Sequence, residues 1–205
     1  MCHHYKGSRQ PPEHLRDEFS IRSNQYHLDF GAGFYPLSEV PIIRLDPAGE
    51  REMVGAEWGL LPLWWKPSDK TPKRAKFQRM CFNARSEDVE KKPTFRDAFK
   101  RRRCLLPGGE FEEKGHYFRF ADDRPFAFAG LWETWRGDDE LVVTCTMLTT
   151  EPNEIVRSVG HHRMPVLLAN QADYALWLNP EATERGAVEH LFAPTDPALM
   201  TLRPK

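Results

Sequence analysis

The chain has 205 residues, 40% of them hydrophobic and 29% charged, a composition that predicts one globular domain with a substantial core. Its 29 Lys and Arg nearly balance 30 Asp and Glu, which excludes a uniformly basic nucleic-acid-binding protein, so any DNA contact would need a local basic surface. The four cysteines form no CxxC pair, no apolar run approaches about 18 residues and no signal-peptide pattern is present, so we expect a cytoplasmic protein without zinc ribbon, disulfides or membrane span.

The chain begins with Met1 and Cys2, and the small cysteine side chain favours removal of the methionine. The mature chain would then carry a free α-amine and a thiol on adjacent carbons, with pKa values of about 8 and about 8.5 in model compounds. Such an amine can condense with an aldehyde to an imine, on which the thiol can close a five-membered thiazolidine ring. The alternative is that Cys2 is merely the second residue, and motifs further along the chain decide between the two.

The first third of the chain predicts a short helix and two strands. Residues 11–19 read as a helix with proline in its first turn, and residues 20–39 are turn-rich and irregular. Strands are predicted over residues 40–45 and over a segment that ends at Trp58. Residues 58–65 are broken by Gly and Pro, so we interpret them as an aromatic loop over the core.

Two basic clusters follow, over residues 66–79 and 91–103, and the second includes a predicted helix over 94–102. Runs of like charge usually form only a solvated face of a protein. Here the clusters lie beside the aromatic residues Trp64, Trp65 and Phe77. Basic charge beside stackable rings is how single-stranded nucleic acid is held without sequence readout, so this segment is a candidate DNA-binding surface.

The second half of the chain predicts a meander of strands followed by helices. Strands are expected over residues 117–120, 125–135, 140–148 and 166–168, and helices over 154–157, from the cap Asn170 to Leu178, and over 180–192. The last dozen residues, about 193–205, are expected to be loosely ordered. We find no linker and no internal repeat.

An ordered set of short motifs spans almost the whole chain and resembles the SRAP (SOS response-associated peptidase) family. The motifs are Cys2, Trp58-Gly59-Leu60-Leu61-Pro62, Asn83-Ala84-Arg85-Ser86-Glu87, Arg103-Cys104-Leu105-Leu106-Pro107, Ala129-Gly130-Leu131-Trp132-Glu133 and His161-His162-Arg163-Met164-Pro165. The resemblance implies an α+β fold: a single domain over residues 1–205 whose strongly curved, mostly antiparallel sheet forms a barrel-like core, with peripheral helices outside and the active groove at one end.

The resemblance also implies a DNA-repair role, in which the protein recognises abasic sites in single-stranded DNA and links to their ring-opened aldehyde through Cys2. Asn83 would orient the cysteine or the aldehyde oxygen, and Glu113 would shuttle protons. His161 would act as a second acid or base, or hold the hydroxyl of the opened sugar. Glu113 needs a raised pKa for this, which Glu110 and Glu112 would promote by like-charge repulsion. If the resemblance to the family is set aside, Asn83 is interpreted as a turn residue, Glu113 as a surface acid and His161 as a core histidine.

Arg85 matches an arginine of the family that contacts DNA phosphate, and we group it with further candidates for DNA binding. The predicted set is Arg85, Trp58, Trp64, Trp65, Lys73, Arg74, Arg163 and Pro36. We expect no cofactor and no metal, a monomer, and a lyase side activity through the imine.

The chain departs from the family in two places. The family commonly begins Cys-Gly-Arg, whereas His3 and His4 follow Cys2 here, which replaces a permanent cation with a partly charged side chain. The family's Gly-Phe-Tyr-Glu-Trp appears as residues 110–114 with only its phenylalanine and glutamate kept. The choice of Glu113 over the adjacent Glu112 therefore rests on one register of an ungapped alignment.

Two other functions remain open at the level of sequence. In a cysteine peptidase with an N-terminal nucleophile, Cys2 would attack a carbonyl with its own amine or His161 as base, and its leading peptide would be the first substrate. A metal site could combine Cys2 and His3 or His4 with His161 or His162, although no spacing supports it. The basic, aromatic segment favours DNA over both.

Overall fold

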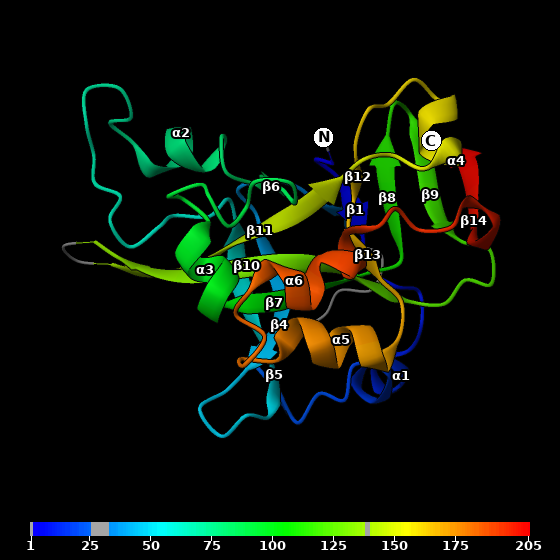
Figure 1. The fold of residues 1–205 in the computed structure, drawn as a ribbon, viewed down its shortest axis with the longest axis horizontal. Helices are drawn as coiled ribbons and strands as arrows, with labels where there is room; N and C mark the ends of the chain where they lie inside the picture. Colours follow the sequence, from blue (N-terminus) through cyan, green and yellow to red (C-terminus); the bar gives the residue numbers. More distant parts are fainter. Residues whose placement is uncertain (1, 26–32, 138–139) are drawn as a thin grey trace.

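The structure, a computed structural model, describes residues 2–25, 33–137 and 140–205 (Figure 1). These residues form two β-sheets and a set of short helices in one domain, so the predicted α+β class is confirmed. The irregular structure expected over residues 20–39 falls partly on 26–32, which lie outside the described residues.

The larger sheet has a closed, barrel-like centre. Its strands are β2 (Ser23–Asn24), β4 (Glu39–Leu45), β5 (Arg51–Trp58), β6 (Asn83–Arg85), β7 (Arg103–Gly108), β10 (Phe126–Arg136), β11 (Leu141–Thr150), β12 (Met164–Pro165) and β13 (Leu167–Leu168). Neighbours pair in the order β11-β10-β7-β4-β5, and an additional parallel pairing of β5 with β11 closes these strands into a ring. The expected curved, mostly antiparallel core is therefore present.

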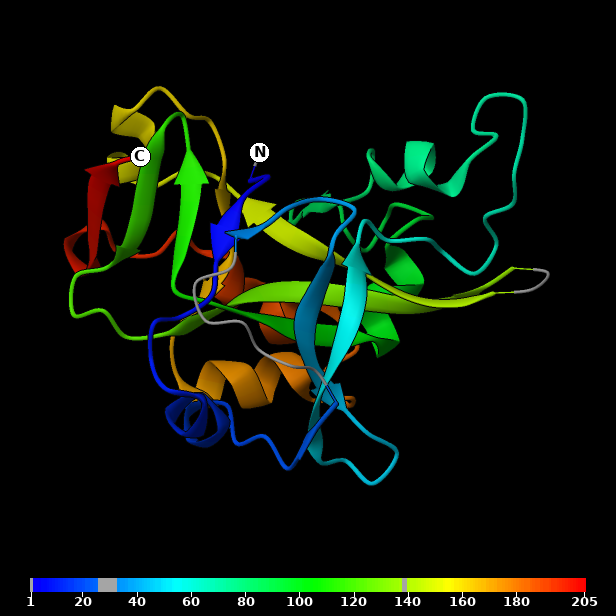
Figure 2. The same cartoon turned by 180° about the vertical axis from the view of Figure 1, so that it is seen from behind.

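The smaller sheet contains both ends of the described chain. Its strands lie in the order β14 (Met200–Pro204), β9 (His116–Phe120), β8 (Glu110–Glu113), β1 (Tyr5–Lys6) and β3 (Gly33–Phe34), all antiparallel. Both views show β1 beside β8 and close to the end of β11, so the segment that carries Cys2 lies where the two sheets meet (Figures 1 and 2).

Helices cover one side of the barrel, where α3 and α5 pack on β7 (Figure 1). The helices are α1 (Pro12–Glu18), α2 (Arg74–Gln78), α3 (Arg96–Arg101), α4 (Glu154–Ser158), α5 (Gln171–Leu178) and α6 (Arg185–Val188), with 3₁₀ turns η1 (Glu189–Phe192) and η2 (Pro197–Leu199). Asn170 caps α5 as predicted, since its Oδ1 accepts from the Asp173 amide at 2.9 Å. Among the described residues, no helix is both long and apolar enough to cross a bilayer.

A cluster of buried hydrophobic residues fills the space between the barrel and the smaller sheet. Tyr5 is fully buried there, with its ring 5.4 Å from that of Trp58 and 5.0 Å from that of Phe128. Complete burial of a large apolar side chain contributes about 1.5–3 kcal/mol, so this aromatic cluster holds β1 firmly in place. Close packing also dictates Gly130, because a Cβ there would lie 2.2 Å from Cδ1 of Leu106.

Two predictions about the end of the chain are wrong. The helix expected over 180–192 is only α6 followed by η1, because the Asn179 side chain accepts from the Glu181 amide at 2.9 Å and forms a turn instead. The tail expected to be loosely ordered forms β14, whose Leu202 lies opposite Phe118 of β9. Antiparallel pairing with β9, from Met200 opposite Phe120 to Pro204 opposite His116, anchors this strand on the smaller sheet.

Candidate active site

Strand β8 carries four consecutive buried side chains that point alternately to its two faces. Phe111 faces the core, where its ring stacks on that of Phe118 at 5.2 Å. Glu110 and Glu112 face outward, and Glu110 accepts two hydrogen bonds from Arg203, at 2.8 and 3.0 Å. The alternation therefore places Glu113 on the inner face with Phe111 and separates it from the two other acids.

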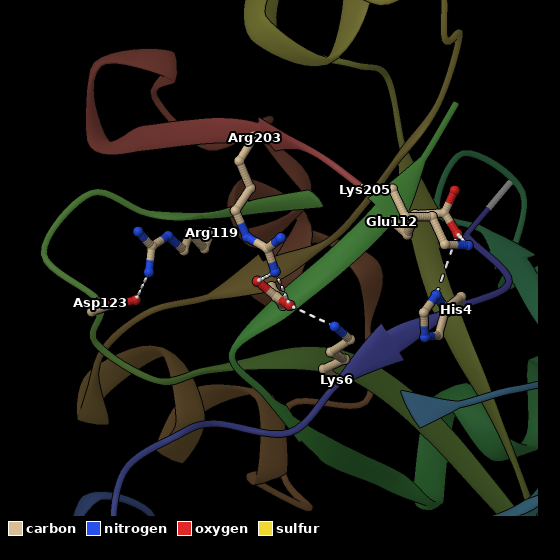
Figure 3. Close-up of polar contacts among 8 residues, drawn as sticks. His4, Lys6, Glu112, Arg119, Asp123, Arg203 and Lys205 are labelled. Carbon is tan, nitrogen blue, oxygen red and sulfur yellow. Dashed lines mark hydrogen bonds and ion pairs between the residues drawn. The ribbon is translucent and has the colours of Figure 1, made fainter. Parts of the chain in front are cut away.

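Glu112 is satisfied on the outer face. Its Oε2 accepts from Nζ of Lys205 at 2.9 Å and lies 3.2 Å from Nδ1 of His4, as Figure 3 shows, and its Oε1 accepts from the Gly115 amide at 3.2 Å. Burial by itself would raise the pKa of Glu112, but the hydrogen bonds from Lys205 and His4 outweigh it and lower that pKa. Glu112 is thus a fixed carboxylate and a poor candidate for proton transfer.

Glu113 instead pairs with His161, whose Nε2 lies 3.0 Å from Glu113 Oε2. The other imidazole nitrogen, Nδ1, lies 2.6 Å from the Arg163 carbonyl oxygen, which can only accept, so Nδ1 carries a proton. The Arg163 amide also lies 3.3 Å from Nδ1, but the much shorter contact decides the tautomer. A neutral His161 therefore directs the lone pair of Nε2 toward Glu113.

The electrostatics of this pair suit proton transfer near neutral pH. Burial raises the pKa of Glu113 to about 7, and the charge of Glu112 adds to the effect. Burial lowers the pKa of His161. With Nε2 of His161 unprotonated, the 3.0 Å contact is a hydrogen bond in which protonated Glu113 donates. The pair holds one proton that either partner can release or take up, as general acid–base chemistry requires.

Cys2 is held by Asn83, the first residue of β6. Asn83 Nδ2 donates to the Cys2 carbonyl oxygen at 2.7 Å, while its Oδ1 is buried without a hydrogen-bond partner among the described residues. The Cys2 side chain is 1% exposed, and its Sγ lies 3.6 Å from the His4 carbonyl oxygen. Burial raises the pKa of the thiol, and the nearby charge of Glu113 raises it further. The cysteine therefore rests as a neutral thiol beside the Glu113–His161 pair.

Two arginines lie near this centre in different states. Arg85 follows Asn83 by two residues in β6, and its side chain is exposed. Arg163 is engaged by both oxygens of Glu87, at 2.5 and 2.9 Å, and donates to the Thr149 carbonyl at 2.6 Å. Arg85 is thus available to a phosphate, whereas Arg163 would have to leave Glu87 to bind one.

The aromatic residues of the predicted DNA-binding set divide into core and surface. Trp58 is fully buried and donates from Nε1 to the Phe82 carbonyl at 2.7 Å. Trp65 is 3% exposed and packs on Trp135, with ring centroids 5.5 Å apart. Neither Trp58 nor Trp65 presents a ring face to a ligand, so their assignment to DNA binding is wrong. Trp64 is 53% exposed and stays a candidate.

The remaining predicted residues are partly available. Lys73 is exposed just before α2, and Pro36 is half-buried after β3. Arg74 is bound by two acids, Glu57 at 2.5 Å and Glu140 at 3.4 Å. The basic segment therefore offers fewer unengaged cations than its sequence suggests.

The structure adds one residue that sequence reasoning did not single out. Tyr35 is 49% exposed and stacks on His4, only two residues after Cys2. The departure at His4 from the family pattern was the available signal, but its partner lies 31 residues away in sequence. In the part of the chain that the structure describes, no three His, Cys, Asp or Glu side chains gather as a metal site.

Comparisons with known proteins agree with this arrangement. A family model described as SOS response associated peptidase (SRAP) matches residues 1–204. The chain is 30% identical over 190 residues to the abasic site processing protein YoqW of Bacillus subtilis (strain 168), covering 88% of this chain and 79% of that protein. It is 26% identical over 211 residues to the abasic site processing protein HMCES of Gallus gallus, covering 85% of this chain and 59% of that protein.

Solved structures show the same fold. A crystal structure of a protein from Bacteroides thetaiotaomicron matches with a TM-score of 0.83 and 24% identity, covering 99% of this chain and 91% of that one. A second, from Bordetella bronchiseptica, matches with a TM-score of 0.81 and 24% identity, covering 100% of this chain and 99% of that one. At these identities the likeness supports the architecture alone.

Proposed function

The chain belongs to the SRAP family, and we propose that it recognises abasic sites in single-stranded DNA and links to them covalently through Cys2. The relatives named as abasic site processing proteins support the substrate. The observation that carries the proposal is the convergence of Asn83 on Cys2 and of His161 on Glu113, since these residues come from four separate segments of the chain.

The proposed reaction begins with hydrolysis of the peptide bond after Met1, which frees the α-amine of Cys2. The amine nitrogen attacks the aldehyde carbon of the ring-opened abasic sugar to form a carbinolamine, which loses water to give an imine. The thiol sulfur then bonds to the imine carbon, and the thiol proton passes to the nitrogen. The product is a thiazolidine, and the linkage step releases one water in total.

Glu113 and His161 are suited to the proton transfers of this sequence. Protonated Glu113 can donate a proton to the departing hydroxyl of the carbinolamine. His161 Nε2 can accept a proton from the amine nitrogen or from solvent. Asn83 fixes the Cys2 carbonyl and so restrains the residue that carries both the amine and the thiol. The buried Oδ1 of Asn83 offers an acceptor for the new α-amine or for a sugar hydroxyl.

The resting state of Cys2 favours this route over a peptidase that attacks with a thiolate. Nucleophilic cysteines of peptidases have thiol pKa values lowered by a neighbouring cation or a helix N-terminus. Burial and the Glu113 charge instead raise the pKa of the Cys2 thiol. An α-amine that reacts first does not need a thiolate, because the thiol acts only after the imine has formed.

The DNA strand would be held by exposed charge and by stacking. Arg85 is the exposed cation closest in sequence to Asn83, and Lys73 and Trp64 are exposed on the basic segment. An imine that the thiol does not capture can also drive β-elimination, which accounts for lyase activity as a side reaction.

Intact mass spectrometry tests the proposal directly. After the protein is mixed with single-stranded DNA that carries one abasic site, we expect a species with the mass of the chain lacking Met1, plus the DNA, less one water. Matched DNA with a tetrahydrofuran analogue has no aldehyde and should give no adduct. Unchanged protein mass with the aldehyde-bearing DNA, or an adduct that retains Met1, would refute the mechanism.

A further inference from the structure

Tyr35 and His4 form a two-ring stack beside the segment that carries Cys2. Their ring centroids are 4.4 Å apart and their planes differ by only 5°. The two rings differ sharply in exposure, because His4 is 2% exposed whereas Tyr35 is 49% exposed. The inner ring is therefore part of the protein interior, and the outer ring is presented to solvent.

The inner ring is fixed from several directions. His4 Nδ1 lies 3.2 Å from the carboxylate of Glu112, which Lys205 binds in turn at 2.9 Å (Figure 3). The ring of Tyr117 meets His4 edge-on, with centroids 5.7 Å apart. Because a carboxylate only accepts, His4 donates from Nδ1, and this bond prevents rotation of the imidazole.

The outer ring is also held in advance of any ligand. The Tyr35 backbone is anchored by Ser38, whose Oγ donates to the Tyr35 carbonyl at 2.7 Å. The absence of a side chain at Gly33 leaves room for both rings, since a Cβ there would be 2.7 Å from His4 Nε2 and 3.3 Å from Tyr35 Cε2. An aromatic side chain that is already ordered loses little further entropy when a partner stacks on it.

We propose that Tyr35, supported from behind by His4, is a stacking platform for a nucleobase that flanks the abasic site in single-stranded DNA. The inference rests on the proposed function and extends it to a contact with the neighbouring nucleotide. Only His3 lies between Cys2 and His4, so the two Cα atoms are at most about 7 Å apart, and the platform lies within reach of a nucleotide next to the reacting sugar.

The charge around the platform suits the backbone of the same strand. On this face of the smaller sheet three basic side chains, Lys6, Arg203 and Lys205, lie against two acidic ones, Glu110 and Glu112. The Lys205 side chain is 53% exposed and can contact a phosphate while it stays near Glu112. Stacking with nearby positive charge is the general mode of binding to single strands without sequence readout.

Substitution of Tyr35 tests the platform. With tetrahydrofuran-containing single-stranded DNA, which binds without reacting, Tyr35→Ala should weaken affinity by about tenfold, equivalent to about 1.4 kcal/mol. Tyr35→Phe keeps the ring and should bind within about twofold of the unsubstituted protein. Leu199→Ala removes another exposed apolar side chain, 45% exposed at the far end of the smaller sheet, and is the matched surface control.

A fluorescent base identifies the contact. 2-Aminopurine placed on either side of the tetrahydrofuran residue should be quenched on binding at one of the two positions, and Tyr35→Ala should remove that quenching while Leu199→Ala leaves it. Formation of the adduct by the unsubstituted protein on aldehyde-bearing DNA tests the proposed function separately. If that adduct forms while Tyr35→Ala binds with unchanged affinity and unchanged quenching, the platform is refuted.

Discussion

Replacement of Glu113 by glutamine should abolish the proton shuttle and at the same time stabilise the folded protein at alkaline pH. Gln keeps the shape of the side chain and can still donate a hydrogen bond to His161 Nε2, which lies 3.0 Å from Glu113 Oε2. It cannot exchange a proton. Loss of one general acid–base group slows a reaction by about 10²–10⁴-fold, which corresponds to about 3–5 kcal/mol of transition-state stabilisation.

The effect on stability follows from the pKa of Glu113, which is raised from 4.5 to about 7 by burial. The folded state then binds this proton more tightly than the unfolded state does. Stability from the protonated carboxyl is fully present below pH 4.5 and is lost as pH rises through about 7. Above that pH the shift costs about 3 kcal/mol, which Glu113→Gln should recover in part.

The assay combines a time course of crosslinked DNA on denaturing gels with urea unfolding at pH 5 and pH 8.5. Glu112→Gln is the matched control, because it removes the adjacent carboxylate on the outer face of β8. It should crosslink at nearly the normal rate, with the limb of the pH–rate profile that reflects Glu113 moved to lower pH, since the Glu112 charge raises the pKa of Glu113. A larger rate defect in Glu112→Gln than in Glu113→Gln, or a loss of stability in Glu113→Gln at pH 8.5, would refute the assignment.

Two further substitutions separate chemistry from binding. Cys2→Ala keeps an α-amine without a thiol, so it should bind DNA normally and form only a hydrolysable imine; a heat-stable crosslink from this variant would remove the thiol from the mechanism. Affinity for single-stranded DNA should fall as salt rises, by roughly 0.7 log units per log unit of salt for each phosphate neutralised, and Arg85→Ala should lower both the affinity and this slope, as salt titrations would show. An unchanged slope would place the Arg85 guanidinium away from phosphate.

The fold was predictable where local pattern and burial agree. Residues 40–45 form a short apolar run bounded by a turn, and this run and the segment that ends at Trp58 form β4 and β5. The segment 200–204 contains a proline and an arginine, and only its pairing with β9, 80 or more residues earlier, makes it a strand. Long-range pairing of this kind leaves no local periodicity to read.

In the site, too, the sequence predicts some features and only the structure supplies the others. The order of motifs singled out Asn83, Glu113 and His161, and the structure supplies the contacts that motifs cannot contain: Asn83 to Cys2, and Glu113 to His161. The choice between the adjacent glutamates depends on which face of β8 each occupies, and an acidic run such as residues 110–113 is not typical of a strand. For the tryptophans, burial decides the role, and composition alone cannot separate a core ring from an exposed one.

The smaller sheet has a consequence for the order of folding. The β8–β9 hairpin is local and can form as soon as its residues are synthesised, but β1 and β14 reach it from opposite ends of the described chain. The ion pairs of Lys6 and Arg203 with Glu110 span 104 and 93 residues respectively, so loop-closure entropy opposes them until the barrel has brought the ends together. We therefore expect the segment that carries Cys2 to join β8 only after the barrel has formed.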